Sequence, residues 1–146
     1  EIPPLRYDLV YKLKQEFPFL TISIIGGINS LDSIESQLTY VDSVMIGREA
    51  YQNPFFLADI DSRFFGGLAD KPTRQDILER LYPYIGEAVS GGVPLKSITR
   101  HILGLFNGEK GARAWRRSLS ENSPRFEGSA IDAINLIKNA AHFITQ

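Results

Sequence analysis

The stretch IIGGINSLDSIESQLTYVDSVMIGREAYQNP, residues Ile24 to Pro54, decides the fold. It contains the end of one apolar run and the whole of a second, and each run stops at a glycine. Gly26 and Gly27 follow the first run, while Gly47 and Arg48 follow the second. Short apolar runs of this kind are typical of strands buried in a parallel sheet. The repeated glycine suggests that both strand ends lie in similar surroundings.

Helical patterns surround these two runs. Tyr7 to Phe17 is predicted to be a helix with its apolar residues on one face, and Ser30 is the predicted N-cap of a short helix between the strands. The strands are predicted over residues 20–25 and 44–46. Because a helix connects them, they should run parallel. Two parallel strands leave both outer edges unpaired, so we expect the missing strands to precede Glu1 or to lie in another molecule.

The second half of the chain has no strand pattern. Thr73 and Asp76 form a predicted capping box for a helix that runs to about Ser90. Further helices are predicted over 94–106, over 111–121 and after Ser129. The predicted fold class is therefore α/β, the tail end of an α/β protein followed by an all-α helical domain. The predicted domain limits are 1–65 for the α/β part, 66–72 for a linker and 73–146 for the helical domain.

Composition narrows the classes of function. The 146 residues are 43% apolar and 23% charged, as in ordinary globular proteins, and the net charge of −1 requires any attraction to nucleic acid to be local. The chain has no cysteine and only two histidines, so no thiolate nucleophile and no metal site are predicted. No apolar run approaches the ~20 residues of a membrane span. We expect a cytoplasmic protein that is a piece of a longer chain, since it lacks an initiator methionine.

The two glycine-terminated strand ends suggest an anion site. Neighbouring parallel strands present their C-terminal ends at the same rim, so Gly26-Gly27 and Gly47-Arg48 should meet there. Glycine lets a ligand approach the backbone closely, and an arginine suits phosphate oxygens. In a (β/α)8 barrel, phosphate binds at the loops after strands seven and eight and at a short extra helix. From this local pattern alone the pairs are either such a site or simple turns. A Rossmann site fits less well, because no G-x-G-x-x-G occurs.

Three longer segments resemble one known family: IPPLRYDLVYKLKQEFPFLTISIIGGI (residues 2–28), VDSVMIGREAYQNPFFL (41–57) and HILGLFNGEKGARAWRRSLSEN (101–122). Together they resemble the tRNA-dihydrouridine synthases, most closely the A subfamily. The resemblance implies an FMN-dependent enzyme with an N-terminal barrel and a C-terminal helical domain that clasps tRNA. It implies that this chain is the C-terminal portion of a (β/α)8 TIM barrel followed by an all-α helical bundle domain. It also implies reduction of uridine at positions 20 and 20a of the D-loop, with NADPH as reductant, and we expect the full-length enzyme to be a monomer.

The resemblance also assigns cofactor-binding residues. The FMN phosphate loop falls on Ile25, Gly26 and Gly27, and its second half on Gly47 and Arg48. The family usually has Asn where this chain has Ile25, which keeps the backbone N–H but loses the side-chain amide. The family's general acid is a cysteine, so this chain should contain no catalytic residue and should be inactive alone.

The predicted tRNA contacts are Arg113 and Arg116, which match arginines that contact tRNA in the subfamily. From the sequence alone, a solvated helix face formed by these arginines together with Arg117 would be the favoured interpretation, and the resemblance reverses that preference. His101 is predicted to be structural, and residues 51–54 to serve packing. Two alternatives stay open: a non-catalytic RNA-binding helical module, or another FMN- or phosphate-binding TIM-barrel enzyme.

Overall fold

The computed structural model describes residues 4–66 and 71–144. The chain divides into two compact units, residues 1–50 and 51–146, and each is described by itself. Helices predominate, and the described part has one sheet of two strands. The coarse prediction of helices around parallel strands is therefore confirmed.

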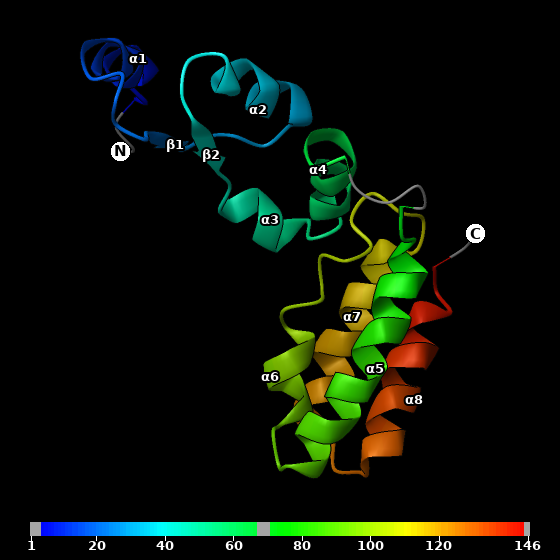
Figure 1. The fold of residues 1–146 in the computed structure, drawn as a ribbon. Coiled ribbons are helices and arrows are strands. Elements are labelled where there is room, and N and C mark those ends of the chain that lie inside the picture. The colour runs from blue at the N-terminus through cyan, green and yellow to red at the C-terminus, as the bar shows by residue number, and fades with distance from the viewer. Residues whose placement is uncertain (1–3, 67–70, 145–146) are drawn as a thin grey trace. The chain divides into compact units, whose positions relative to one another are not determined.

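The first unit holds the sheet. Strand β1 (Ser23–Ile25) runs parallel to β2 (Ser43–Met45), as predicted, and the short helix α2 (Leu31–Leu38) connects them (Figure 1). The side chain of Ser30 accepts a hydrogen bond from the Ser33 N–H at 3.1 Å, so Ser30 is the N-cap that the sequence predicted. The parallel direction and the connecting helix together make this unit a β-α-β element.

Strand β1 is shorter than predicted, and the reason lies in its backbone partners. The carbonyl oxygen of Leu20 accepts a hydrogen bond from Lys14 Nζ at 2.8 Å, and the Ile22 N–H donates to Asp42 Oδ2 at 2.8 Å. These backbone groups bind side chains instead of a neighbouring strand. The prediction that the strand begins at Leu20 is therefore wrong, because the ladder begins only at Ser23.

Helix α1 (Tyr7–Glu16) packs against the unit through its tyrosines. Tyr11 Oη donates a hydrogen bond to Gln37 Oε1 at 2.6 Å, and its ring stacks on that of Tyr40 with centroids 4.3 Å apart. The helix has no buried residue. Leu9 and Phe17 of its predicted apolar face are 51% and 40% exposed, so that face is not covered by residues that the structure describes.

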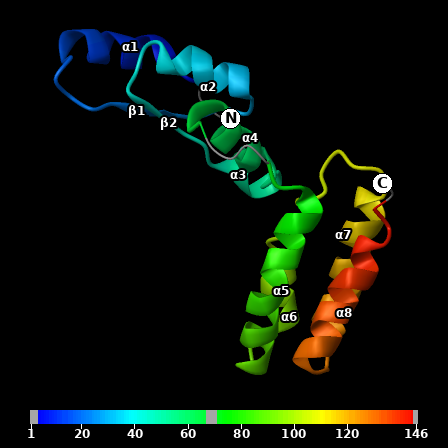
Figure 2. The same cartoon turned by 45° about the vertical axis from the view of Figure 1, so that its right-hand side comes forward.

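The second unit is helical. Its helices are α4 (Phe56–Phe64), α5 (Arg74–Ser90), α6 (Leu95–Thr99), α7 (Ala112–Asn122) and α8 (Ala130–Ala141), with a 3-10 turn η1 at Ser123–Arg125. Helix α3 (Arg48–Gln52) is a short helix directly after Gly47, and the division between the units falls within it. Both views show α5, α7 and α8 side by side (Figures 1 and 2).

Two capping boxes fix the starts of the long helices. Thr73 and Asp76 cap α5, and Ser129 and Asp132 cap α8, each pair exchanging side-chain and backbone hydrogen bonds. The sequence predicted the first box and the second N-cap. In both boxes the pKa of the aspartate is lowered, because the carboxylate accepts hydrogen bonds from the backbone and side chain of the capping residue.

The core of the second unit forms around the chain's single tryptophan. Trp115 is fully buried, and its ring meets that of Phe106 edge to face with centroids 4.9 Å apart. Leu78 and Ile85 of α5 and Ile137 of α8 are buried with it. Burying an aromatic side chain of this size stabilises a fold by roughly 3–5 kcal/mol relative to alanine. One core therefore joins helices that are distant in sequence.

Two predictions in the second half need correction. The helix predicted over 94–106 ends at Thr99, because the N–H groups of His101, Ile102 and Leu105 donate to carbonyl groups three residues back and so form turns instead of an α-helix. Helix α4 was not predicted. Residues 67–70 of the predicted linker lie outside the described residues, and the predicted domain limits stay a prediction.

Candidate functional site

The sheet register places the two predicted phosphate-binding segments at one end of the strands. Ile25 is paired with Met45, the last residue of β2. The next residues along the two strands therefore leave the sheet at the same rim, with Gly26-Gly27 on one side and Gly47-Arg48 on the other. The rim geometry expected from parallel strands is present, while the assignment of a cofactor to it stays a prediction.

Gly26 and Gly27 have a structural reason to be glycine. Their φ angles are +115° and +60°, in the left-handed region that side chains disfavour. A Cβ on Gly26 would lie 2.8 Å from a methyl carbon of Leu5, and one on Gly27 would lie 2.9 Å from the other. Tyr7 Oη also donates a hydrogen bond to the Gly26 carbonyl oxygen. The turn is thus tightly packed on this side, whether or not a ligand binds.

Gly47 differs, because local packing does not require a glycine there. Its φ lies outside the left-handed region, and a Cβ placed on it would meet no atom within 4 Å. The Arg48 side chain beside it is exposed, and within residues 4–66 and 71–144 it has no hydrogen bond or ion pair. A bare backbone next to a free guanidinium suits an anionic group that approaches from outside the chain.

Lys14 is another cation near the strands, and its ammonium group already has partners within the chain. Its Nζ donates to the carbonyl oxygens of Pro18 and Leu20 and lies 2.8 Å from Asp42 Oδ2. The Asp42 carboxylate also accepts a hydrogen bond from the Ile22 N–H, and that backbone bond, with the Lys14 contact, lowers its pKa. Lys14 therefore fastens α1 to the strands and is not free to bind a ligand.

The three arginines of α7 have different surroundings. Arg117 forms an exposed ion pair with Glu121 at 2.8 Å, which raises the pKa of the guanidinium. Arg116 is half-buried, and its Nη1 donates to Asn107 Oδ1 at 2.9 Å. Arg113 is exposed, and no group in the described part of the chain pairs with it. Arg113 and Arg116, the predicted tRNA contacts, are thus the two whose charge is not neutralised by a carboxylate.

His101 and Tyr51 lie together on the surface of the second unit. Tyr51 Oη is 2.9 Å from His101 Nδ1, and Arg100 Nε donates to His101 Nε2 at 3.0 Å. An arginine can only donate, so Nε2 accepts in this contact, while Nδ1 faces the tyrosine hydroxyl group. In this contact both ring nitrogens serve side-chain hydrogen bonds, and no cluster in the described ranges could hold a metal ion.

Sequence reasoning missed the role of Arg74. Its guanidinium lies over the ring of Phe55, 4.0 Å from the centroid, and donates to the Leu105 carbonyl oxygen and to Glu109 Oε1. These contacts fasten the start of α5 to the segment before α7. No local sequence signal marks them, since the partners lie about 20 to 35 positions away along the chain.

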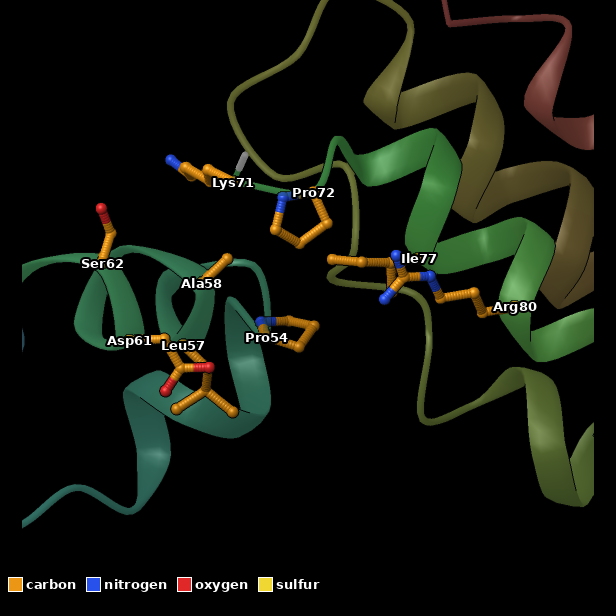
Figure 3. A pocket seen from close by; sticks show the side chains of 9 residues that line it. All are labelled: Pro54, Leu57, Ala58, Asp61, Ser62, Lys71, Pro72, Ile77 and Arg80. Atoms are coloured by element: carbon orange, nitrogen blue, oxygen red, sulfur yellow. The ribbon is translucent and has the colours of Figure 1, made fainter. Parts of the chain in front are cut away.

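A hollow of about 270 Å³ lies within the second unit where α4 faces the start of α5 (Figure 3). Pro54, Leu57 and Asp61 border it on one side, with Ile77 and Arg80 on the other. Lys71, which also lines it, forms an ion pair with Asp59. None of the predicted site residues lines this hollow. No helix among the described residues is both long and apolar enough to cross a lipid bilayer.

Comparison with known proteins gives a consistent picture. The family model of dihydrouridine synthases, "Dihydrouridine synthase (Dus)", matches residues 1–142. A tRNA-dihydrouridine(20/20a) synthase of Haemophilus ducreyi is 48% identical over 146 residues, which is 100% of this chain and 44% of that protein. Proteins of the same name from Shewanella oneidensis and Escherichia coli K12 are 48% and 46% identical over 93% and 99% of this chain.

The chain spans about two fifths of the length of these relatives, 40% to 44%. The family match nevertheless runs through both compact units, from the two-stranded sheet to the end of α8. Such a continuous match shows that the chain belongs to the dihydrouridine synthase family.

Proposed function

We propose that this chain is the C-terminal part of a flavin-dependent tRNA-dihydrouridine synthase. The whole protein would reduce uridine at positions 20 and 20a of the D-loop to 5,6-dihydrouridine, with NADPH as reductant. The observation that carries the proposal is the family match over residues 1–142, combined with relatives of that printed activity at 46% to 48% identity. A cytoplasmic, monomeric enzyme would fit this role.

The finer fold belongs to the same proposal. The β-α-β element of the first unit would be the last part of a (β/α)8 barrel, whose other strands would cover its open edges. The helices after residue 72 would be the helical tRNA-binding domain. The parallel register of β1 and β2 supports the barrel, because strands of such a barrel all run parallel.

The rim residues fit the phosphate of FMN. Gly47 leaves an open place where a Cβ would otherwise stand, and Arg48 offers a permanently charged donor group with which no group in residues 4–66 and 71–144 pairs. Gly26 and Gly27 would complete the cradle with their backbone. When bound, the flavin would supply the reducing equivalents for the C5–C6 double bond. The contribution of these residues is to hold its phosphate end.

Ile25 would take part only through its backbone. Its side chain is 56% exposed in the described part of the chain, so the asparagine that the family usually carries would not disturb the packing of that part. We propose that loss of the side-chain amide weakens the phosphate site slightly but leaves it functional.

The surface of α7 would bind tRNA through Arg113 and Arg116. Binding of a nucleic-acid backbone requires cations whose charge is not cancelled by a carboxylate, and among the described residues no carboxylate pairs with either arginine. Arg117 is less suited, because Glu121 competes for its guanidinium. The uridine must leave its stack to reach a flavin, so the protein must grip the distorted tRNA around it.

The test separates the enzyme from the alternatives. The full-length protein should copurify with yellow FMN and form dihydrouridine in the D-loop of unmodified tRNA when NADPH is added. The 146-residue chain alone should form none, because it has no cysteine to act as general acid. An RNA-binding module would bind tRNA without flavin, and another FMN barrel enzyme would hold flavin without acting on tRNA. Either result would refute the proposal.

A further inference from the structure

Asn107 connects Arg116 to a backbone group of another segment. Its Nδ2 donates a hydrogen bond to the carbonyl oxygen of Gln52, the last residue of α3, and its Oδ1 accepts the hydrogen bond from Arg116 Nη1 at 2.9 Å. Asn107 lies in the irregular segment between α6 and α7. One side chain thus joins a fixed backbone atom to a predicted tRNA contact.

The orientation of the Asn107 amide follows from the chemistry of its two partners. A carbonyl oxygen can only accept, and a guanidinium can only donate. The amide nitrogen must therefore face Gln52 and the amide oxygen must face Arg116. Neither aspartate nor leucine, which have nearly the same size, offers a donor and an acceptor at these two positions.

The backbone of Gln52 is itself held in place. A Cβ on Gly104 would lie only 2.1 Å from the Gln52 carbonyl oxygen, so the two backbone segments are in direct contact. This contact leaves little freedom for the oxygen that Asn107 binds. The amide is consequently anchored at one end, and its oxygen presents a fixed acceptor to the arginine.

A neutral partner has an electrostatic consequence for Arg116. Arg117 is paired with the carboxylate of Glu121, and this negative charge weakens the attraction of Arg117 for any other anion. Asn107 carries no charge, so Arg116 keeps its full positive charge while its side chain loses rotational freedom. Only one of its five N–H donors points at Asn107, and the others remain for an anion.

We infer that Asn107 is a positioning residue for tRNA binding: it holds the Arg116 guanidinium in the binding conformation without neutralising it. The inference rests on the proposed function, in which α7 binds tRNA. A long side chain that is already held in its binding conformation loses less entropy when it binds. Asn107 can therefore strengthen tRNA binding through Arg116 without contacting the RNA itself.

The experiment is a double-mutant cycle in the full-length protein, with an unmodified tRNA transcript as the probe. Asn107→Ala and Arg116→Ala should each weaken binding by about threefold to tenfold, and the double variant should be no weaker than Arg116→Ala alone. Arg113→Ala is the matched control, because Arg113 lies on the same helix without touching Asn107. In a double variant of Arg113→Ala and Asn107→Ala, the fold losses of tRNA affinity should multiply.

A second variant guards against a general folding effect. Asn107→Asp keeps the size and the acceptor but adds a negative charge beside Arg116, so it should weaken binding more than Asn107→Ala. Both variants lose the hydrogen bond to the Gln52 carbonyl oxygen and should melt somewhat below the parent, so binding is compared at a temperature at which melting curves show all three proteins folded. The inference would be overturned if the fold losses of tRNA affinity caused by Asn107→Ala and Arg116→Ala multiplied in the double variant. It would also be overturned if Asn107→Ala bound tRNA as tightly as the parent. If tRNA binds but Arg116→Ala has no effect, the inference fails and the proposed function stands. If the parent binds no tRNA, both fail.

Discussion

The hydroxyl group of Tyr7 donates a hydrogen bond to the carbonyl oxygen of Gly26, so the first residue of α1 holds the turn that follows β1. Tyr7→Phe removes this bond and leaves a carbonyl oxygen without its partner. The free energy of unfolding of the full-length protein should fall by about 0.5–1.5 kcal/mol. Denaturant titration measures it, and an unchanged midpoint would show that the bond contributes nothing.

Gly47 and Gly27 should respond differently to alanine. A Cβ at position 47 would meet no atom within 4 Å, and the backbone φ there suits any residue. Gly47→Ala should therefore change the free energy of unfolding by less than about 0.5 kcal/mol while FMN retention falls. Gly27→Ala is the control. With a φ of +60° and Leu5 at 2.9 Å, it should destabilise the protein itself. Flavin absorbance per protein and a thermal melt distinguish the two, and full flavin retention by Gly47→Ala would remove the case for a ligand there.

Replacing Arg113 and Arg116 together by alanine should weaken tRNA binding by the full-length protein. Each lost phosphate contact removes counterion release, so the slope of log affinity against log salt should fall by roughly 1 per arginine. Affinities over a salt series provide the measurement. A normally folded double variant with parental affinity would return both side chains to the role of a solvated helix face.

Gly111 and Gly108 form a matched pair in the second unit. Both have positive φ angles, +93° and +86°, so alanine at either position should cost about 1–2 kcal/mol from backbone strain. A Cβ on Gly111 would also lie 1.8 Å from the Phe143 carbonyl oxygen, whereas one on Gly108 meets nothing. Gly111→Ala should therefore be clearly the more destabilising in denaturant titration. Equal costs would contradict the packing of α7 against the end of α8.

The capping box of α8 should make stability depend on pH. The pKa of Asp132 is lowered in the folded chain by hydrogen bonds from Ser129, so its carboxylate stabilises the fold above the unfolded value of about 4. This contribution is lost as the pH falls through the lower folded pKa. Asp132→Asn keeps an acceptor for the cap but removes the charge, so its melting temperature should lie below that of the parent at neutral pH, and the difference should shrink as the pH falls through the acid range. Superimposable pH profiles would refute this.

Local signals explain what the sequence could predict. The capping box of Thr73 and the cap at Ser129 each lie within three residues of their partners, and both helices begin where expected. The parallel strands followed from the intervening helix, which also depends on local pattern. Helix α4 was missed because its N-cap, Phe55, makes no side-chain hydrogen bond and so leaves no signature.

Contacts between residues far apart in the sequence account for what could not be predicted. The helix predicted through Phe106 stops at Thr99, and in the turns that follow, the carbonyl groups of Ile102 and Leu105 accept hydrogen bonds from side chains of α7 and α5. In the candidate site, the shared rim of Gly27 and Gly47 was predictable from strand direction. The link from Arg116 through Asn107 was not, because nothing in a sequence pattern specifies which side chain will meet a carbonyl 55 positions away.

The buried Trp115 gives the chain a built-in optical reporter. It is the only tryptophan of the 146 residues, and it lies in the core of the second unit. Its emission should shift to the red when that core opens to water, while melting of the β-α-β element should leave the emission unchanged. Fluorescence and far-ultraviolet circular dichroism, followed in one titration, would therefore report whether the two units unfold together or in separate steps.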